Sequence, residues 1–258
     1  SRYKKLGLPS GAGYFKRIQD LTAAWQTMNN ENISLQAIAK EDNALYSTLA
    51  NLKAALERDG YMDFSYAIRL AAEELGKISE KAGTDIEKFR YLFVDEYQDI
   101  NPIQESFIRT FAQFMDLLFV VGDDDQAIYG WRGADVQNIL TFEDRYDNVS
   151  THKLLVNFRS TKAIVDVANS FVQSTLNYER LPKDISSHSD GNIQDMRKLW
   201  FENREDEARW IAQRIQSLVG TTYIEYNPNG TEKSRRGLTY SDFAILLRGI
   251  RSSNGENR

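Results

Sequence analysis

The chain lacks several residue types and patterns, and each absence excludes a class of site. It has no cysteine, which excludes disulfide bonds and thiolate metal centres and favours a reducing compartment, the cytoplasm. Its two histidines, His152 and His188, have no metal-ligand spacing, so we interpret both as structural or solvent-exposed. No apolar run has membrane-spanning length, and no signal peptide is recognisable. The phosphate-binding pattern G-x-x-x-x-G-K-[ST] is also missing, because the only Gly-Lys pair, Gly76–Lys77, is followed by Ile78.

Charge is distributed unevenly along the 258 residues. Residues 1–88 carry equal numbers of acidic and basic groups, residues 89–150 carry a net charge of −8, and residues 151–258 carry +3. The acidic middle is typical of a cation site, whereas the total of −5 argues against a protein that coats nucleic acid non-specifically. Single strands can still be bound by aromatic stacking, which depends less on positive charge. An apolar content of 41% is ordinary for soluble globular domains, of which we expect one to three.

Two short apolar runs, Tyr91–Val94 and Leu117–Val121, each end in acidic residues. Runs of this length predict strands that are buried on both faces, as in a parallel sheet. Between them, Pro102–Met115 has apolar residues at helical spacing, with Asn101 as the expected N-cap. The segment therefore predicts a βαβ unit, and in such sheets ligands bind beyond the carboxyl ends of the strands.

The first of these strands is followed directly by Asp95 and Glu96. A nucleotide hydrolase needs such a pair, because one carboxylate holds Mg²⁺ and the other orients the attacking water. For the pair alone, an acidic surface loop is the alternative. The second acidic run, GDDDQAIYGWRGAD, favours the hydrolase. It places Gln126 three residues beyond Asp123, where its amide can contact a phosphate oxygen; the alternative is a surface turn residue.

The loop continues with Tyr129, Trp131 and Arg132. Aromatic rings beside an arginine suit stacking on exposed bases together with a phosphate contact. The alternative is that both rings belong to the core. The flanking Gly130 and Gly133 favour an exposed, sharply turning loop instead.

A further strand is predicted over Val149–Val156, and it is followed by Asn157, Phe158 and Arg159. A helix is predicted over Ser160–Val172, with Ser160 as its cap. We expect Ile164, Val167, Ala168 and Phe171 to form the inward face of that helix. An arginine at the end of a strand suits an arginine finger that reaches a phosphate. The alternative for Arg159 is a structural ion pair with the acidic middle region.

The motifs as a set resemble those of the UvrD/Rep-type helicases of superfamily 1. YLFVDEYQD and LLFVVGDDDQAIYGWRGAD resemble their motifs II and III, LLVNFRST at 154–161 resembles motif IV, and DFAILLRG at 242–249 resembles a later strand of their second motor domain. The resemblance covers roughly residues 60–258. It implies an α/β fold, with a partial RecA-like parallel sheet, a helical insertion, and the start of a second RecA-like domain.

The resemblance also implies ligands and residue roles. The ligands are ATP, Mg²⁺ and single-stranded DNA, or DNA with a single-stranded tail. Phe158 stands where the family commonly has tyrosine, so stacking on adenine is expected without the hydroxyl. The implied site comprises Asp95 for the metal, Glu96 as base, Gln126 at the γ-phosphate, Arg159 as the finger, and Tyr129, Trp131 and Arg132 for DNA.

Three regions follow from the resemblance: residues 1–88 as the helical insertion, 89–150 as part of the first RecA-like domain, and 151–258 as the start of the second. The family's phosphate loop precedes motif II, and its motifs V and VI come later than any motif found here. We therefore expect an interior piece of a longer protein that is inactive by itself.

Periodicity and turn signals predict the remaining elements. We expect residues 1–12 as a loop, helices over Gly13–Met28, from Ser34 to Gly60, from Phe64 to about Ile78 and from about Val136 to Tyr146, an irregular connection over 173–195, a strand over Lys198–Phe201, a helix over Glu205–Leu218, a hairpin over Thr221–Arg236, a buried strand over Phe243–Leu247, and a frayed tail.

The resemblance therefore implies part of an ATP-dependent helicase that moves 3′ to 5′ on single-stranded DNA, as members of the family do. One alternative is the motor part of a helicase–nuclease subunit, which a nuclease domain further along the chain would reveal. Another is a non-catalytic nucleic-acid-binding module with a vestigial motor, against which the intact DEYQD and Arg159 weigh.

Overall fold

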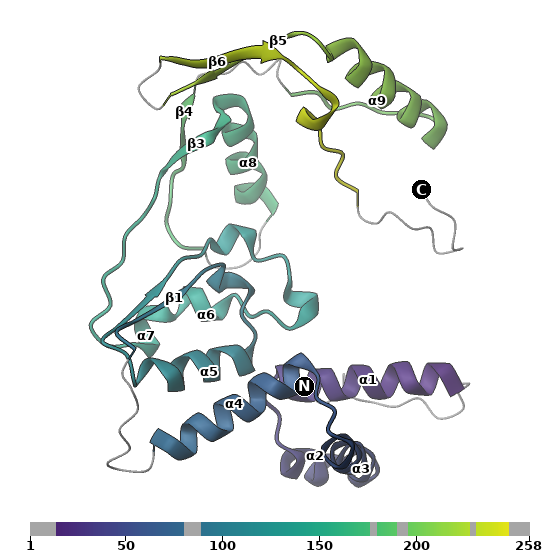
Figure 1. The fold of residues 1–258 in the computed structure, drawn as a ribbon, viewed down its shortest axis with the longest axis vertical. Coiled ribbons are helices and arrows are strands. Elements are labelled where there is room, and N and C mark those ends of the chain that lie inside the picture. Colours follow the sequence, from purple (N-terminus) through teal and green to yellow (C-terminus); the bar gives the residue numbers. More distant parts are fainter. Residues whose placement is uncertain (1–13, 80–88, 176–179, 190–195, 228–230, 248–258) are drawn as a thin grey trace. The chain divides into compact units, whose positions relative to one another are not determined.

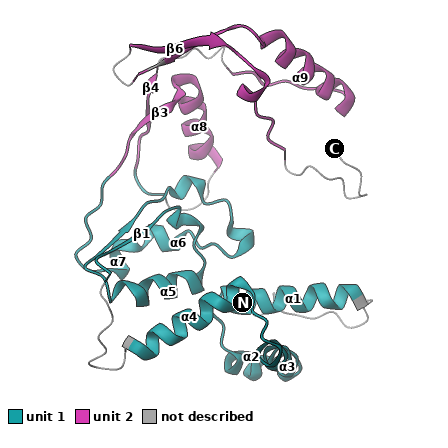
Figure 2. Ribbon diagram, viewed as in Figure 1, with its two compact units in different colours: residues 1–152, 176–182 teal, residues 153–175, 183–258 magenta. Residues whose placement is uncertain are grey.

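The computed structural model describes residues 14–79, 89–175, 180–189, 196–227 and 231–247 (Figure 1). The chain divides into two compact units, residues 1–152 with 176–182 and residues 153–175 with 183–258 (Figure 2). The predicted loop over residues 1–12 and the predicted frayed tail lie outside the described residues. Within the described part of the chain, every helix is too short or too polar to cross a bilayer.

The first unit begins with four helices, α1 (Tyr14–Asn30), α2 (Leu35–Glu41), α3 (Asn43–Asp59) and α4 (Phe64–Ser79). Ser34 caps α2 through its side chain, and Gly60 ends α3 in the left-handed conformation, so both predicted helix ends are confirmed. The single helix predicted between them is wrong. Asp42 has an extended backbone, and its Oδ1 accepts hydrogen bonds from the amides of Ala44 and Leu45, which starts a second helix there.

The four helices share one apolar core around Trp25. Its ring packs edge-to-face on Tyr66 with 5.2 Å between centroids, and its Nε1 donates to Asp63 Oδ2 at 2.8 Å. Asp63 also accepts from the amide of Tyr66, which confirms it as the cap of α4. Burying each large apolar side chain contributes about 1.5–3 kcal/mol. The cluster contains Ala24, Trp25, Met28, Ile33, Ile38, Leu45, Leu49 and Tyr66.

The predicted βαβ unit is confirmed in the first unit. Strand β1 (Tyr91–Val94) pairs in parallel with β2 (Leu117–Val120), and α5 (Pro102–Ala112) connects them. Asn101 forms a capping box with Gln104, and Pro102 occupies the first turn, as the sequence indicates. Helix α4 packs against α5, which joins the helical core to the βαβ unit (Figure 1).

Only one face of this sheet is buried, so the prediction of two buried faces is wrong for this chain. Leu92, Val94, Leu118 and Val120 pack against Tyr97, Ile100 and Ile108. On the opposite face, Phe93 is 69% exposed and Phe119 is 48% exposed. An apolar run makes both faces of a strand suitable for burial, but the packing of other elements decides which face is covered.

Two short helices, α6 (Gln137–Leu140) and α7 (Phe142–Arg145), replace the single helix predicted from about Val136 to Tyr146. The backbone leaves the helical region at Thr141, where φ is −107° and ψ is 25°. The break lets α6 and α7 contribute different side chains to one buried polar network, described below.

The second unit begins with β3 (Val156–Thr161), α8 (Lys162–Thr175) and β4 (Ser186–Ser189), and β3 pairs in parallel with β4. The predicted strand ends where β3 begins, so its position is wrong. Ser160 lies inside β3 and does not cap α8. Strand β4 falls in the predicted irregular connection, because its sequence, SSHS, has no apolar signal.

The predicted inward face of α8 is also wrong. Ala163 and Val165 are its buried residues, whereas Ile164, Val167, Ala168 and Phe171 are exposed. Helix α8 contacts both β3 and β4, and the packing of these elements, which the helical spacing does not encode, decides which of its side chains are buried.

The last described elements are α9 (Arg204–Leu218), β5 (Thr222–Tyr226) and β6 (Glu232–Gly237). Helix α9 and the antiparallel hairpin of β5 and β6 confirm the predicted helix and hairpin. Asn203, which the sequence analysis does not single out, caps α9. The strands predicted over 198–201 and 243–247 are wrong. Neither segment forms a strand in the described part of the chain, and Leu246 is 94% exposed.

Candidate active site and nucleic-acid interface

The carboxyl ends of β1 and β2 lie at the same edge because the two strands are parallel and in register. The loops that follow are tied together by backbone bonds. The amide of Val121 donates to the carbonyl of Val94 at 2.8 Å, and the amide of Tyr97 donates to the carbonyl of Val121 at 2.9 Å. Both acidic runs therefore begin at one place.

Glu96 has a left-handed backbone, with φ 51° and ψ 45°. This conformation is rare for a residue with a β-carbon and often marks a functional turn. Asp95 supports the turn, since its Oδ1 accepts from the amide of Glu96 at 2.9 Å. Both carboxylates are exposed, so the turn presents them to solvent side by side.

A buried glutamine, Gln98, joins the two loops. It is 1% exposed, its Nε2 donates to Glu96 Oε2 at 2.7 Å, and its Oε1 accepts from the amide of Asp123 at 2.9 Å. Asp123 in turn accepts from Gln126 Nε2 at 2.7 Å. This series of hydrogen bonds connects Glu96 with Gln126 at the same edge of the sheet, and Asp95 lies directly before Glu96.

Asp99 lies behind this edge in a less favourable environment. Burial, and then the negative charge of Glu96, raise the pKa of its carboxyl above the ordinary value. Among the described residues, nothing donates a hydrogen bond to its buried Oδ1. Glu96 and Asp99 therefore influence each other electrostatically, which adds to the case for a functional cluster.

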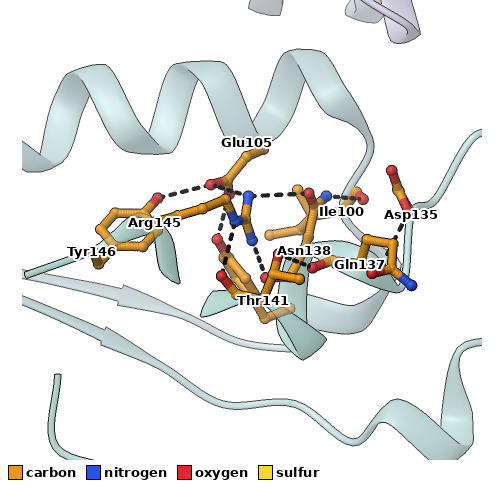
Figure 3. A network of polar contacts seen from close by, with 9 residues as sticks. Ile100, Glu105, Asp135, Gln137, Asn138, Thr141, Arg145 and Tyr146 are labelled. Atoms are coloured by element: carbon orange, nitrogen blue, oxygen red, sulfur yellow. Dashed lines mark hydrogen bonds and ion pairs between the residues drawn. The ribbon is translucent and has the colours of Figure 1, made fainter. Parts of the chain in front are cut away.

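A polar network around Glu105 and Arg145 links α5, α6 and α7 (Figure 3), and Tyr97 of the turn donates to it. Glu105 of α5 accepts from Tyr97, from Arg145 Nη1 at 2.7 Å and from Tyr146 at 3.0 Å. Asn138 of α6 accepts from Arg145 and donates to the carbonyl of Ile100. Burial raises the pKa of Tyr146 to about 12; the hydrogen bond with Tyr97 opposes this increase, and the charge and hydrogen bond of Glu105 add to it.

The second predicted group, Tyr129, Trp131 and Arg132, lies on an exposed loop. Trp131 is 76% exposed, and the guanidinium carbon of Arg132 lies 4.7 Å from its ring centroid and 5.2 Å from that of Tyr129. Gly133 closes the turn with φ 92°. The expectation of an exposed, sharply turning loop is therefore confirmed, and the alternative of two core aromatics is wrong.

This loop borders an open cleft of about 1120 Å³ in the first unit. Its other walls come from α1, from the start of α4, and from Asp99, Asn101 and Gln104. Phe64, the first residue of α4, is 92% exposed and lines the same cleft. Sequence reasoning did not select Phe64, although its position directly after the helix cap Asp63 was a signal that it starts a helix at the surface.

Phe158 and Arg159 lie on β3 of the second unit and are both exposed. The Phe158 ring contacts His188 of β4 with 4.8 Å between centroids, so His188 is less isolated than the sequence indicates. Asn157 Oδ1 accepts from the amides of Arg159 at 2.9 Å and Ser160 at 2.7 Å, which fixes the backbone beneath both side chains.

Comparison with known families agrees with the motif resemblance. A family model described as the UvrD/REP helicase N-terminal domain matches residues 5–147. The chain belongs to the UvrD/REP helicase family. A second model, the UvrD-like helicase C-terminal domain, matches residues 152–255.

Several relatives in the UvrD/REP family carry the name ATP-dependent DNA helicase PcrA. The protein from Leuconostoc citreum is 36% identical over 211 residues, which cover 80% of this chain and 26% of that protein. The protein from Staphylococcus epidermidis strain ATCC 12228 is 33% identical over 231 residues, covering 87% and 29%. The protein from Staphylococcus aureus strain NCTC 8325 is 35% identical over 195 residues, covering 75% and 24%. The chain thus spans 24–29% of the length of these relatives.

The residues at the carboxyl end of β1 can be compared with what a bound cation needs. In the described part of the chain, no group of three or more His, Cys, Asp or Glu residues is arranged to hold a metal. Mg²⁺ does not need such a cage, since it is usually held by one or two carboxylates together with water and nucleotide phosphates. Exposed Asp95, beside exposed Glu96, supplies that kind of oxygen ligand.

Proposed function

We propose that this chain is the central part of the motor of an ATP-dependent DNA helicase that moves 3′ to 5′ along single-stranded DNA. In this proposal, residues 1–88 are a helical insertion, 89–150 are part of a first RecA-like domain, and 151–258 begin a second one. The observation that carries the proposal is the hydrogen-bond series from Glu96 through Gln98 and Asp123 to Gln126. It places a carboxylate suited to water activation and an amide suited to phosphate contact on one supported edge.

At this edge we assign Asp95 to Mg²⁺, which would supply charge neutralisation at the phosphates of ATP. Glu96 accepts the proton of the attacking water, because its carboxylate is exposed while the turn beneath it is held. Gln126 donates to the terminal phosphate in place of its bond to Asp123. Arg159 supplies positive charge in the transition state, and Phe158 stacks on adenine.

We further propose that the cleft beside Trp131 binds single-stranded DNA. Exposed Trp131, Tyr129 and Phe64 are available for stacking, and Arg132 lies over the first two rings and can reach a phosphate. The cleft belongs to the same unit as Glu96 and Gln126, so in this proposal the first unit contacts both ligands.

The decisive experiment is Glu96→Gln in the full-length protein that carries this chain. The substitution keeps an oxygen that can accept from Gln98, so the turn and nucleotide binding are expected to survive. Turnover is expected to fall by about 10²–10⁴, as is usual for a lost general base. Single-turnover ATP hydrolysis and nucleotide affinity, each with a single-stranded oligonucleotide present, measure the two effects.

Glu74→Gln is the matched control, because Glu74 is an exposed carboxylate on α4 that pairs only with Lys77 among the described residues. It should leave turnover unchanged. Wild-type turnover in Glu96→Gln would remove Glu96 from the role of base. A wild-type protein without DNA-stimulated hydrolysis would favour the vestigial-motor alternative.

A further inference from the structure

The segment Arg180–Pro182 belongs to the first unit, although the elements before and after it, α8 and β4, belong to the second. Its contacts are made with the loop that carries Gln126. Arg180 Nε and Nη2 donate to the two carboxylate oxygens of Asp125, both at 2.5 Å. The amide of Leu181 donates to Asp124 Oδ2 at 3.1 Å.

These contacts are shielded from solvent. The side chain of Asp125 is 12% exposed, that of Arg180 is 22% exposed, and Asp124 as a whole is 1% exposed. A bidentate guanidinium–carboxylate pair fixes orientation as well as distance, and screening by water weakens it less at such a site than at the surface. The run of three aspartates is thereby explained, because Asp124 and Asp125 are each engaged in holding this segment.

We propose that Arg180 is a positioning residue for Gln126, an inference that rests on the proposed function of that glutamine. Asp124, Asp125 and Gln126 form one 3₁₀ turn, which Asp123 caps on one side. Arg180 binds the carboxylate of Asp125, the residue directly before Gln126. The two restraints together define where the Gln126 amide can reach.

The contact between Arg180 and Asp125 also concerns the second unit, because of where Arg180 lies in the chain. The segment that holds the turn is also the connection between α8 and β4 of the second unit. A shift of the Asp124–Gln126 turn on phosphate binding or release would therefore act on that connection through Asp124 and Asp125. Arg180 would transmit the state of the nucleotide to the chain that leads into the second unit.

The experiment compares Arg180→Ala and Arg180→Lys in the full-length protein, with ATP, Mg²⁺ and a single-stranded oligothymidylate. Arg180→Ala is expected to lower kcat by about 10- to 100-fold, the size of effect that small misplacements cause. The KM for ATP is expected to change by less than about twofold, because Gln126 would act mainly in the transition state. Arg180→Lys keeps the charge but loses the bidentate contact with Asp125. Its kcat should therefore lie between those of the wild type and Arg180→Ala.

Hydrogen exchange gives a readout that does not depend on activity. The amides of Asp125 and Gln126 are bonded inside the turn, and the amide of Leu181 is bonded to Asp124. Arg180→Ala is expected to accelerate exchange in peptides covering these residues. Arg58→Ala is the control, because Arg58 forms an exposed pair with Asp59 on the same unit. It should change neither exchange nor kcat.

Unchanged exchange at residues 123–127 in both Arg180 variants would overturn the inference. So would a kcat equal to that of Arg58→Ala, even with a lower melting temperature, since that pattern means a purely structural contact. A higher KM with normal kcat would also overturn it. If the wild-type protein shows no DNA-stimulated hydrolysis, the proposed function fails, and the exchange data alone still decide whether Arg180 holds the turn.

Discussion

At the scale of single residues, Gln98 and Gly122 support the edge on which the proposed chemistry depends. An amide suits residue 98 because it donates to Glu96 and accepts from Asp123 at the same time. Gly122 lies so close to Gln98 that a β-carbon at residue 122 would be 2.8 Å from Gln98 Oε1 and 3.3 Å from the backbone nitrogen of Gln98. It would also be 2.8 Å from Ile139 Cδ1. Glycine is therefore needed for close approach.

Gly122→Ala is expected to lower the free energy of unfolding by about 1–3 kcal/mol, because the new methyl group overpacks the site. Denaturation in urea measures the change. Gly76→Ala is the control: Gly76 lies inside α4 with no atom within 4 Å of the added β-carbon. That change should stabilise the protein by about 0.5–1 kcal/mol through helix propensity. Equal midpoints for the wild type and Gly122→Ala would show that Gln98 moves at little cost.

One base of the single-stranded DNA is expected to stack on the ring of Trp131. In the full-length protein, Trp131→Ala should weaken binding of a single-stranded oligonucleotide by about 1–3 kcal/mol. Trp200→Ala is the matched control, since Trp200 is 92% exposed but lies in the second unit, outside the cleft. Fluorescence titrations at one fixed salt concentration compare the two. If both variants bind as the wild type does, stacking on Trp131 is refuted.

At the scale of elements, several helices begin at a side chain that caps their first turn. Asp42, Asp63, Asn101 and Asn203 each place a side-chain oxygen on amides of the first turn. These bonds are local, so a short stretch of sequence is sufficient to specify them. Asn101 also orients the start of α5 directly after the turn of Glu96 and Asp99, and thereby links helix stability to the site.

Asn101→Ala is expected to destabilise the chain by about 1 kcal/mol through loss of the capping box. Asn51→Ala is expected to stabilise the chain by roughly 0.5 kcal/mol. Asn51 is exposed in the middle of α3, where alanine is the better helix former. Thermal unfolding of the two variants beside the wild type tests the difference in sign. A shift in the same direction for both would mean that capping does not dominate at Asn101.

At the scale of the whole molecule, charge and the missing phosphate loop govern what residues 1–258 can do alone. The segment 89–150 has a net charge of −8, and no G-x-x-x-x-G-K-[ST] pattern occurs anywhere in the chain. Phosphoryl transfer depends almost entirely on positioning and charge stabilisation. Without backbone amides and a lysine around its phosphates, a triphosphate would be repelled by the acidic edge.

Residues 1–258 alone are therefore expected to show no ATP hydrolysis and no unwinding, even with Mg²⁺ and single-stranded DNA. Isothermal titration with ATP and Mg²⁺, beside a coupled hydrolysis assay, measures binding and turnover. The same assays on the full-length protein that carries this chain are the positive control. Tight binding or DNA-stimulated turnover by this chain alone would mean that it contains a phosphate site of another kind.

The sequence by itself determined the features that depend on neighbours along the chain. These include the βαβ unit, the caps Ser34, Asp63 and Asn101, the hairpin of β5 and β6, and the family, which the acidic motifs identify. Each is specified by residues a few positions apart, where periodicity and hydrogen-bonding side chains act directly. The exposed loop of Trp131 was predictable for the same reason, since its two glycines lie within the loop.

The tertiary structure alone decided which apolar faces are covered and which distant polar groups meet. It exposed Phe93, which its apolar run places inside, and Ile164, which helical spacing places inside, because burial depends on the elements that pack there. It also joined Glu96 to Asp123 through Gln98, and Asp125 to Arg180 across 55 positions in the chain. No local pattern encodes such pairs, since their energy arises only when the folded chain brings both partners out of water together.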